Sequence, residues 1–231
     1  MARLRIGLLI LLCSPLVAAA QDKSEQKEKP DRWEEAIRVF EDWDSRNSFP
    51  SDAVLFVGSS SIRLWPTREC FKELPVINRG FGGSQISEVN TYAKRIVLPY
   101  APKAIVFYAG DNDIAAGQSA ERVLADYKAF TKLVHASLPA TRIIFISIKP
   151  SRSRWALWPV MSEANEMIRD FSRKDKRLFY FDGAAPLLGA DGLPNLELFM
   201  PDKLHLNGKG YEVWTKLLRP IIEEALKPDS K

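Results

Sequence analysis

Two short stretches far apart in the sequence carry residues that could perform covalent chemistry together. Ser60 lies in the Gly-Ser-Ser-Ser-Ile sequence at 58–62, directly after an apolar run, and Asp202 precedes His205 by three residues. An imidazole is the natural general base near neutral pH. A neighbouring carboxylate can keep one ring nitrogen protonated, which leaves the other free to accept a serine proton. These residue types and their spacing predict a nucleophile (Ser60), a base (His205) and an orienting carboxylate (Asp202).

Two further loops could donate hydrogen bonds to a developing oxyanion. Three glycines within residues 80–83 leave backbone N–H groups unobstructed, and a dinucleotide-binding pattern fails there because Gln85 occupies its last glycine position. Asn112 follows another apolar run and carries a neutral amide donor. The expected oxyanion hole consists of the backbone N–H groups of Ser60 and Gly83 and the side chain of Asn112.

Each of these stretches also has a purely structural interpretation. The serines are suitable as a helix N-cap, and the glycine-rich and Asn112 segments are suitable as turns. A calcium loop starting at Asp111 lacks the required residues at Ala115 and Ala116, and the Asp202–His205 pair lacks a third metal ligand. Cys70 has no histidine near it in the sequence and is not expected to act as a nucleophile.

The elements that must position these residues alternate between strands and helices. We predict strands at Val54–Val57, Pro75–Asn78, Ala104–Tyr108, Arg142–Ile148 and Leu178–Phe181, and helices near 61–72, 84–98, 119–138, 160–174 and 208–226. Such alternation is typical of an α/β fold with a doubly wound parallel sheet and helices on both faces. In this fold ligands bind at the carboxyl ends of the strands, where all four candidate stretches are predicted to lie.

The first 31 residues are expected to lie outside the folded domain. Residues 1–20 read as a signal peptide, with arginines before an apolar run that is too short to span a bilayer, and small residues before Gln21. Leu12 before Cys13 argues against a lipid-anchored protein. Residues 21–31 form a polar tether, and a single domain spans 32–227. The domain begins with an amphipathic helix at 32–44, which Asp31 is expected to cap and whose apolar residues, Trp43 among them, are expected to face inward. We therefore expect export to the periplasm or the cell exterior, with no stable membrane anchor.

The charge and cysteine content of the mature chain exclude other classes. Removing two signal-peptide arginines from 33 basic residues leaves 31 against 29 acidic ones, a net charge of +2, which gives no basis for nucleic-acid binding. Cys70 is the only cysteine left after Cys13 is removed, so an intramolecular disulfide is impossible. The sequence does not indicate an oligomeric state.

The four stretches together resemble the SGNH hydrolases, also called the GDSL lipase/esterase family. The blocks occur in family order, as Gly58-Ser59-Ser60, Gly83, Asn112 and Asp202-x-x-His205. The resemblance implies a flavodoxin-like three-layer α/β/α sandwich with a five-stranded parallel sheet, and catalysis without a metal or organic cofactor. The usual Gly-Asp-Ser is Gly-Ser-Ser here, which matches a Gly-Ser-Ser-Ser-Ile…Trp branch through Ile62 and Trp65. Alignment on Gly58 favours Ser60 over Ser61 as the nucleophile.

The substrate is expected to be a small-molecule or carbohydrate ester. Trp65 and Trp155 could stack on sugar rings and Arg154 could bind an acidic group, although the tryptophans could equally well only pack the rim. Removal of a short acyl group such as acetyl from a carbohydrate is the preferred reaction, because no long apolar lid is evident. Lysophospholipase or thioesterase activity stays open, and the alternative of another class is a catalytically silent glycan-binding module.

Overall fold

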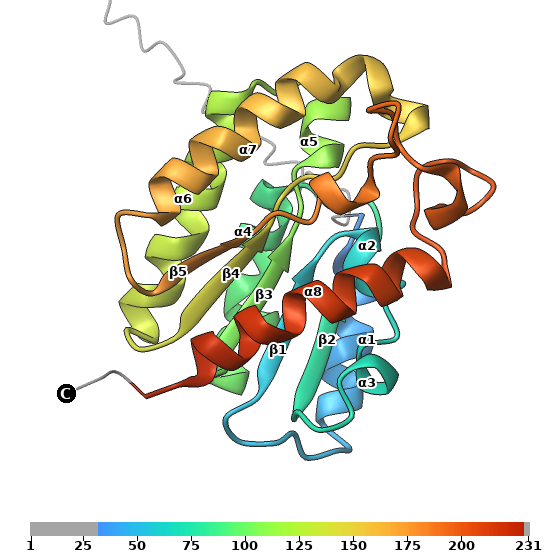
Figure 1. Ribbon diagram of the computed structural model, residues 1–231. Coiled ribbons are helices and arrows are strands. Elements are labelled where there is room, and N and C mark those ends of the chain that lie inside the picture. The colour runs from blue at the N-terminus through green and yellow to red at the C-terminus, as the bar shows by residue number, and fades with distance from the viewer. Residues whose placement is uncertain (1–31, 229–231) are drawn as a thin grey trace, which may run out of the picture. The chain divides into compact units, whose positions relative to one another are not determined.

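The computed structural model describes residues 32–228, so the predicted signal peptide and tether lie outside the described residues. Its centre is a five-stranded parallel sheet with the strand order β2-β1-β3-β4-β5 (Figure 1). The strands are β1 (Val54–Gly58), β2 (Val76–Gly80), β3 (Ala104–Tyr108), β4 (Arg142–Ile146) and β5 (Leu178–Phe181). This is the flavodoxin-like order, so the expected α/β fold class is confirmed.

Eight α-helices and several short 3₁₀ turns connect the strands within the described residues. The helices are α1 (Glu34–Asp44), α2 (Ser60–Arg63), α3 (Thr67–Cys70), α4 (Ile86–Ile96), α5 (Asp111–Ala115), α6 (Ala120–Ser137), α7 (Trp158–Ser172) and α8 (Gly208–Leu226). The predicted helix at 61–72 is wrong, because Pro66 lacks an N–H and separates α2 from α3. The short helix α5 was not predicted.

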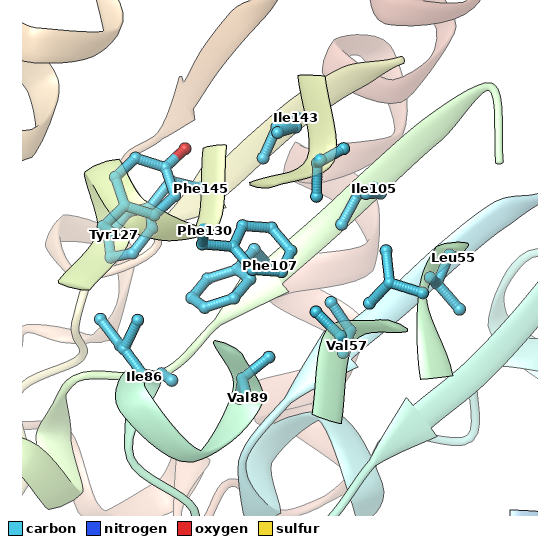
Figure 2. Packing of buried hydrophobic residues seen from close by; sticks show 14 of the residues in the cluster. Leu55, Val57, Ile86, Val89, Ile105, Phe107, Tyr127, Phe130, Ile143 and Phe145 are labelled. Carbon is cyan, nitrogen blue, oxygen red and sulfur yellow. The ribbon is translucent and has the colours of Figure 1, made fainter. Parts of the chain in front are cut away.

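The helices form a layer on each face of the sheet, and alternate strand residues point to the two layers. Figure 2 shows Leu55, Ile105 and Phe107 on the face that packs against α1, α4, α6 and α7. The intervening residues, such as Phe56 and Val106, pack against α2, α3 and α8. All five residues of β1 and of β3 are buried, as expected for central parallel strands covered on both faces.

Helix α1 is held to the domain by charged contacts as well as by the buried side chain of Ile37. Arg95 on α4 forms ion pairs with Glu34 at 2.7 Å and Glu41 at 2.6 Å, and Asp44 pairs with the buried guanidinium of Arg79. The prediction that Trp43 faces inward is wrong, because 50% of its surface is exposed. The predicted cap of this helix, at residue 31, lies outside the described residues.

Candidate active site

The candidate nucleophile lies directly beyond the carboxyl end of β1. Gly58 ends the strand with a φ of +138°, and a Cβ there would lie 1.9 Å from the Tyr108 carbonyl oxygen. The Ser59 N–H donates to that same oxygen at 2.9 Å, which fixes the exit from the strand against β3. Ser60 is then the first residue of α2. Ser59 occupies the N-cap position of this helix, as the sequence allowed, but its side chain makes no capping hydrogen bond.

Ser60, His205 and Asp202 lie in one hydrogen-bonded line. The distance is 2.6 Å from His205 Nδ1 to Asp202 Oδ2 and 3.0 Å from His205 Nε2 to Ser60 Oγ. A carboxylate can only accept, so Nδ1 carries the proton in the neutral ring and Nε2 accepts from the Ser60 hydroxyl. This is the arrangement that a general base needs to remove the Ser60 proton. Ser61 is buried, and the hydrogen bond to His205 comes from Ser60.

A tight turn holds the carboxylate and the imidazole together. Lys203 adopts the left-handed conformation with a φ of +57°, and the N–H groups of Leu204 and His205 donate to Asp202 Oδ1 at 2.9 and 3.0 Å. Partial burial opposes ionisation of Asp202, but hydrogen bonds from the His205 ring and from the His205 and Leu204 N–H groups outweigh it and lower its pKa to about 2. The Asp202 side chain is therefore an anion near neutral pH.

The three predicted oxyanion donors gather beside Ser60. Gly83 has a φ of +78°, a conformation that favours glycine. Among residues 32–228, the backbone N–H groups of Ser60 and Gly83 have no hydrogen-bond acceptor. The Asn112 Nδ2 group donates to the Ser84 carbonyl at 3.1 Å, which leaves its second hydrogen available. These groups and Ser60 line the same cavity.

The Arg154 guanidinium contacts the Asn112 amide and does not extend freely into the cavity. It donates to Asn112 Oδ1 at 3.0 Å and forms an ion pair with Asp111 at 3.1 Å. Lys149, which is 1% exposed, approaches the same Asp111 carboxylate at 3.4 Å. Burial lowers the pKa of Lys149, and the attraction of Asp111 offsets part of that effect. The arrangement fixes the orientation of the amide, because Oδ1 faces a donor and Nδ2 faces an acceptor.

The triad opens into a cavity of about 610 Å³, a size suited to a small-molecule ligand. One part of its wall is polar, with Ser60, His205, Asn112 and the glycine loop. The other part is apolar. Ala36, Val39 and Phe40 of α1 line it together with Trp33, which directly precedes α1, and with Phe81 and Leu204. Two guanidinium groups, those of Arg63 and Arg154, also line it.

Two of the three predicted substrate-binding residues do not line this cavity. Trp65 is 2% exposed, packs against Phe56 and Tyr211, and donates to Thr215 at 3.2 Å. The prediction that it binds substrate is wrong, because its ring belongs to the core under α8. Trp155 is partly buried and stacks on Trp158 outside the cavity wall, so only Arg154 of the three lies at the site.

Several site residues were not identified from the sequence. The α1 residues have the same three- and four-residue spacing as a helix that packs on the core, so the pattern alone could not place them in a cavity wall. Asn78 links β2 to α2, since its Nδ2 donates to the Ile62 carbonyl at 2.8 Å. Lys149 carried a signal that could have been noticed, because a lysine directly after an apolar strand is rarely buried without a partner.

Residues 32–228 contain no group of three or more His, Cys, Asp or Glu side chains arranged to hold a metal ion. Nor do they include a helix with the length and apolar character needed to cross a membrane.

Comparison with known proteins agrees with this geometry. No curated protein matches the chain in sequence. Among solved structures, one described as an acylhydrolase of Bacteroides fragilis has a TM-score of 0.75 and 18% identity, over 86% of this chain and 100% of that chain. A GDSL-like lipase of Bacteroides thetaiotaomicron has a TM-score of 0.70 and 19% identity, over 82% and 98%. A family 3 carbohydrate esterase of Talaromyces cellulolyticus has a TM-score of 0.63 and 18% identity, over 78% and 100%.

These TM-scores show a shared fold, and a family model shows the relationship in sequence. The model of the GDSL-like lipase/acylhydrolase family matches residues 58–213, which is more than half of the 231-residue chain. The matched segment includes the Ser60, Gly83, Asn112, Asp202 and His205 positions. The chain belongs to the GDSL-like lipase/acylhydrolase family.

Proposed function

We propose that this protein is a serine carboxylic ester hydrolase that works through an acyl-enzyme. The observation that carries the proposal is the continuous line from Ser60 Oγ to His205 Nε2, at 3.0 Å, and from His205 Nδ1 to Asp202, at 2.6 Å. This line opens into the cavity beside three oxyanion donors. A hydroxyl, an oriented imidazole and preorganised donors are the parts that acyl transfer requires.

Each group has a defined part in the proposed reaction. Ser60 Oγ forms a bond to the ester carbonyl carbon while its proton passes to His205 Nε2, and Asp202 stabilises the resulting imidazolium. The carbonyl oxygen becomes an oxyanion that accepts hydrogen bonds from Ser60 N–H, Gly83 N–H and Asn112 Nδ2. The proton on Nε2 then leaves with the alcohol, and an acyl-enzyme remains. Water, deprotonated by His205, attacks this intermediate and releases the acid.

For the substrate we propose a short acyl group, acetyl being the first choice, on a carbohydrate or similar small alcohol. One similar structure is an acetyl esterase carrying an acetate ion, with 16% identity and a TM-score of 0.62, and another is the family 3 carbohydrate esterase. The support from aromatic side chains is weaker than the sequence indicated, since Trp65 is in the core. We also propose that residues 1–20 direct export of the protein.

The test is the Ser60→Ala variant assayed with p-nitrophenyl acetate. We expect turnover to fall to the level of a protein-free blank while the thermal unfolding midpoint stays unchanged, because Ser60 is only partly buried. Ser61→Ala is the matched control and should keep most of the activity. A fluorophosphonate probe that labels Ser61, or labels neither serine in folded protein, would contradict the assignment and favour a silent binding module.

A further inference from the structure

The cavity beside the triad combines an apolar wall with unneutralised positive charge. Its apolar side includes Ala36, Val39 and Phe40 on α1 and Trp33 directly before this helix. No aspartate or glutamate of the described residues lines it, although two arginines do. An aqueous pocket with this lining favours a ligand that has both an apolar portion and a negative charge.

The two arginines differ in whether other side chains already pair with their guanidinium groups. The Arg154 guanidinium is occupied by Asp111 and Asn112. Arg63 is exposed, and within residues 32–228 no carboxylate or other acceptor pairs with it. Its charge is therefore available to a ligand, while that of Arg154 serves the oxyanion hole.

The position of Arg63 directs this charge to the reaction site. Arg63 is three residues after Ser60 in α2, so the two side chains lie on the same side of the helix. Its guanidinium lies against Gly82, where an added Cβ would be only 2.8 Å from Nε. Gly82 thus admits the guanidinium to the cavity beside the Gly83 oxyanion donor.

We infer that Arg63 determines specificity for esters that carry a carboxylate or phosphate group close to the scissile bond, with the apolar portion of the substrate against α1. The inference rests on the proposed ester hydrolysis and names the class of ester. Among the short-chain esters proposed above, an acetyl ester of a neutral sugar would leave the Arg63 charge unused, whereas an ester that carries an acidic group and an apolar portion would use both walls of the cavity.

The experiment compares pairs of esters that differ by one negative charge. The first pair is para-acetoxybenzoate and its methyl ester, with the charge on the alcohol portion. The second is mono-p-nitrophenyl succinate and p-nitrophenyl butyrate, with the charge on the acyl portion. In the wild type, kcat/KM for the charged member of at least one pair, relative to its neutral partner, should decrease as salt is added.

Arg63→Gln should lower that charged-to-neutral ratio by about fivefold, the upper value for an exposed ion pair. Arg63→Lys should restore part of it, since the charge returns without the planar geometry. Val39→Asp places a negative charge on the opposite wall and should lower the same ratio. Arg68→Gln is the matched control, because Arg68 is exposed on α3 and does not line the cavity.

An unchanged ratio for both pairs in Arg63→Gln, or an equal decrease in Arg68→Gln, would overturn the inference. Failure of the proposed function gives a different result. In that case the neutral esters themselves are not hydrolysed by the wild type, or are hydrolysed equally well by Ser60→Ala.

Discussion

Replacing Arg154 by glutamine tests how the oxyanion hole is held in place. Two contacts orient the Asn112 amide: Arg154 donates to Oδ1 at 3.0 Å, and Nδ2 donates to the Ser84 carbonyl at 3.1 Å. A rotated amide would place Nδ2 against the guanidinium and Oδ1 against a carbonyl oxygen, and both contacts would be repulsive. With Arg154 removed, only the Ser84 contact opposes this rotation.

The transition-state stabilisation lost in Arg154→Gln should lie between the contribution of one hydrogen bond and the contribution of the whole Asn112 donor. Removing an oxyanion donor, as in Asn112→Ala, should cost about 3 kcal/mol of transition-state stabilisation. Loosening the amide should cost less, and we expect about 1.4 kcal/mol, or tenfold in kcat. The change also removes one positive charge from the group formed with Lys149 and Asp111, which acts in the same direction.

The assay is steady-state hydrolysis of p-nitrophenyl acetate by the single variants and by the double variant with Asn112→Ala. If Arg154 acts through Asn112, the double variant should be little slower than Asn112→Ala alone. Arg152→Gln is the matched control, because its nearest carboxylate, on Asp191, is 3.9 Å away. A rise in KM at constant kcat, or additive losses in the double variant, would refute this reasoning and indicate direct substrate binding by Arg154.

Three further predictions concern the triad, the exit from β1 and a buried carboxyl group. Asp202→Asn should lower kcat by on the order of 10⁴-fold with little change in KM, because the amide no longer holds the Nδ1 proton. Near-normal kcat in steady-state assays would show that the carboxylate is dispensable. Gly58→Ala should reduce the free energy of unfolding in urea by more than about 3 kcal/mol, because its Cβ would lie 1.9 Å from a carbonyl oxygen. Gly192→Ala, with a φ of +73° but no neighbour within 4 Å, should cost only about 1 kcal/mol, and equal losses would exclude the steric explanation. Burial, partly offset by the Ile86 N–H, raises the pKa of Asp113 from 3.8 to about 7. The protonated form of Asp113 is therefore favoured in the folded state. The free energy of unfolding should decline as pH rises from about 4 through 7, by up to about 4 kcal/mol, since each pKa unit corresponds to about 1.36 kcal/mol. In urea unfolding at several pH values, Asp113→Asn should show a smaller decline, and an equal pH dependence of stability in both proteins would contradict this account.

The order of elements could be predicted because each central strand is a short apolar run with clear ends. Residues 54–57 and 104–108 read as buried strands, and both have every residue buried. The local breaks were harder to predict. A single helix was predicted at 61–72, whereas α3 begins directly after Pro66, which has no N–H to continue the preceding helix.

The triad could be predicted because acyl transfer restricts which residue types serve each role, and few candidates existed. His205 is one of two histidines in the chain, and the other, His135 on α6, bonds to the Thr141 carbonyl. The role of a tryptophan cannot be narrowed in this way from its residue type, since tryptophan serves equally as a core residue and as a sugar-stacking surface. The local sequence around Trp65 does not indicate whether its ring faces a cavity or α8. Its place in the core follows from its packing against Tyr211 and Trp214, which are distant in the sequence.

The three adjacent serines show how the fold assigns different roles to identical side chains. Successive residues of a helix are rotated by about 100°, so only one of the three can face His205. Ser59 is still extended and buried, Ser60 begins α2 and is partly exposed, and Ser61 is turned into the core at 1% exposure. The starting point of α2 is set by Gly58, whose approach to β3 admits no side chain. The glycine therefore selects which serine attacks, although it takes no part in the chemistry.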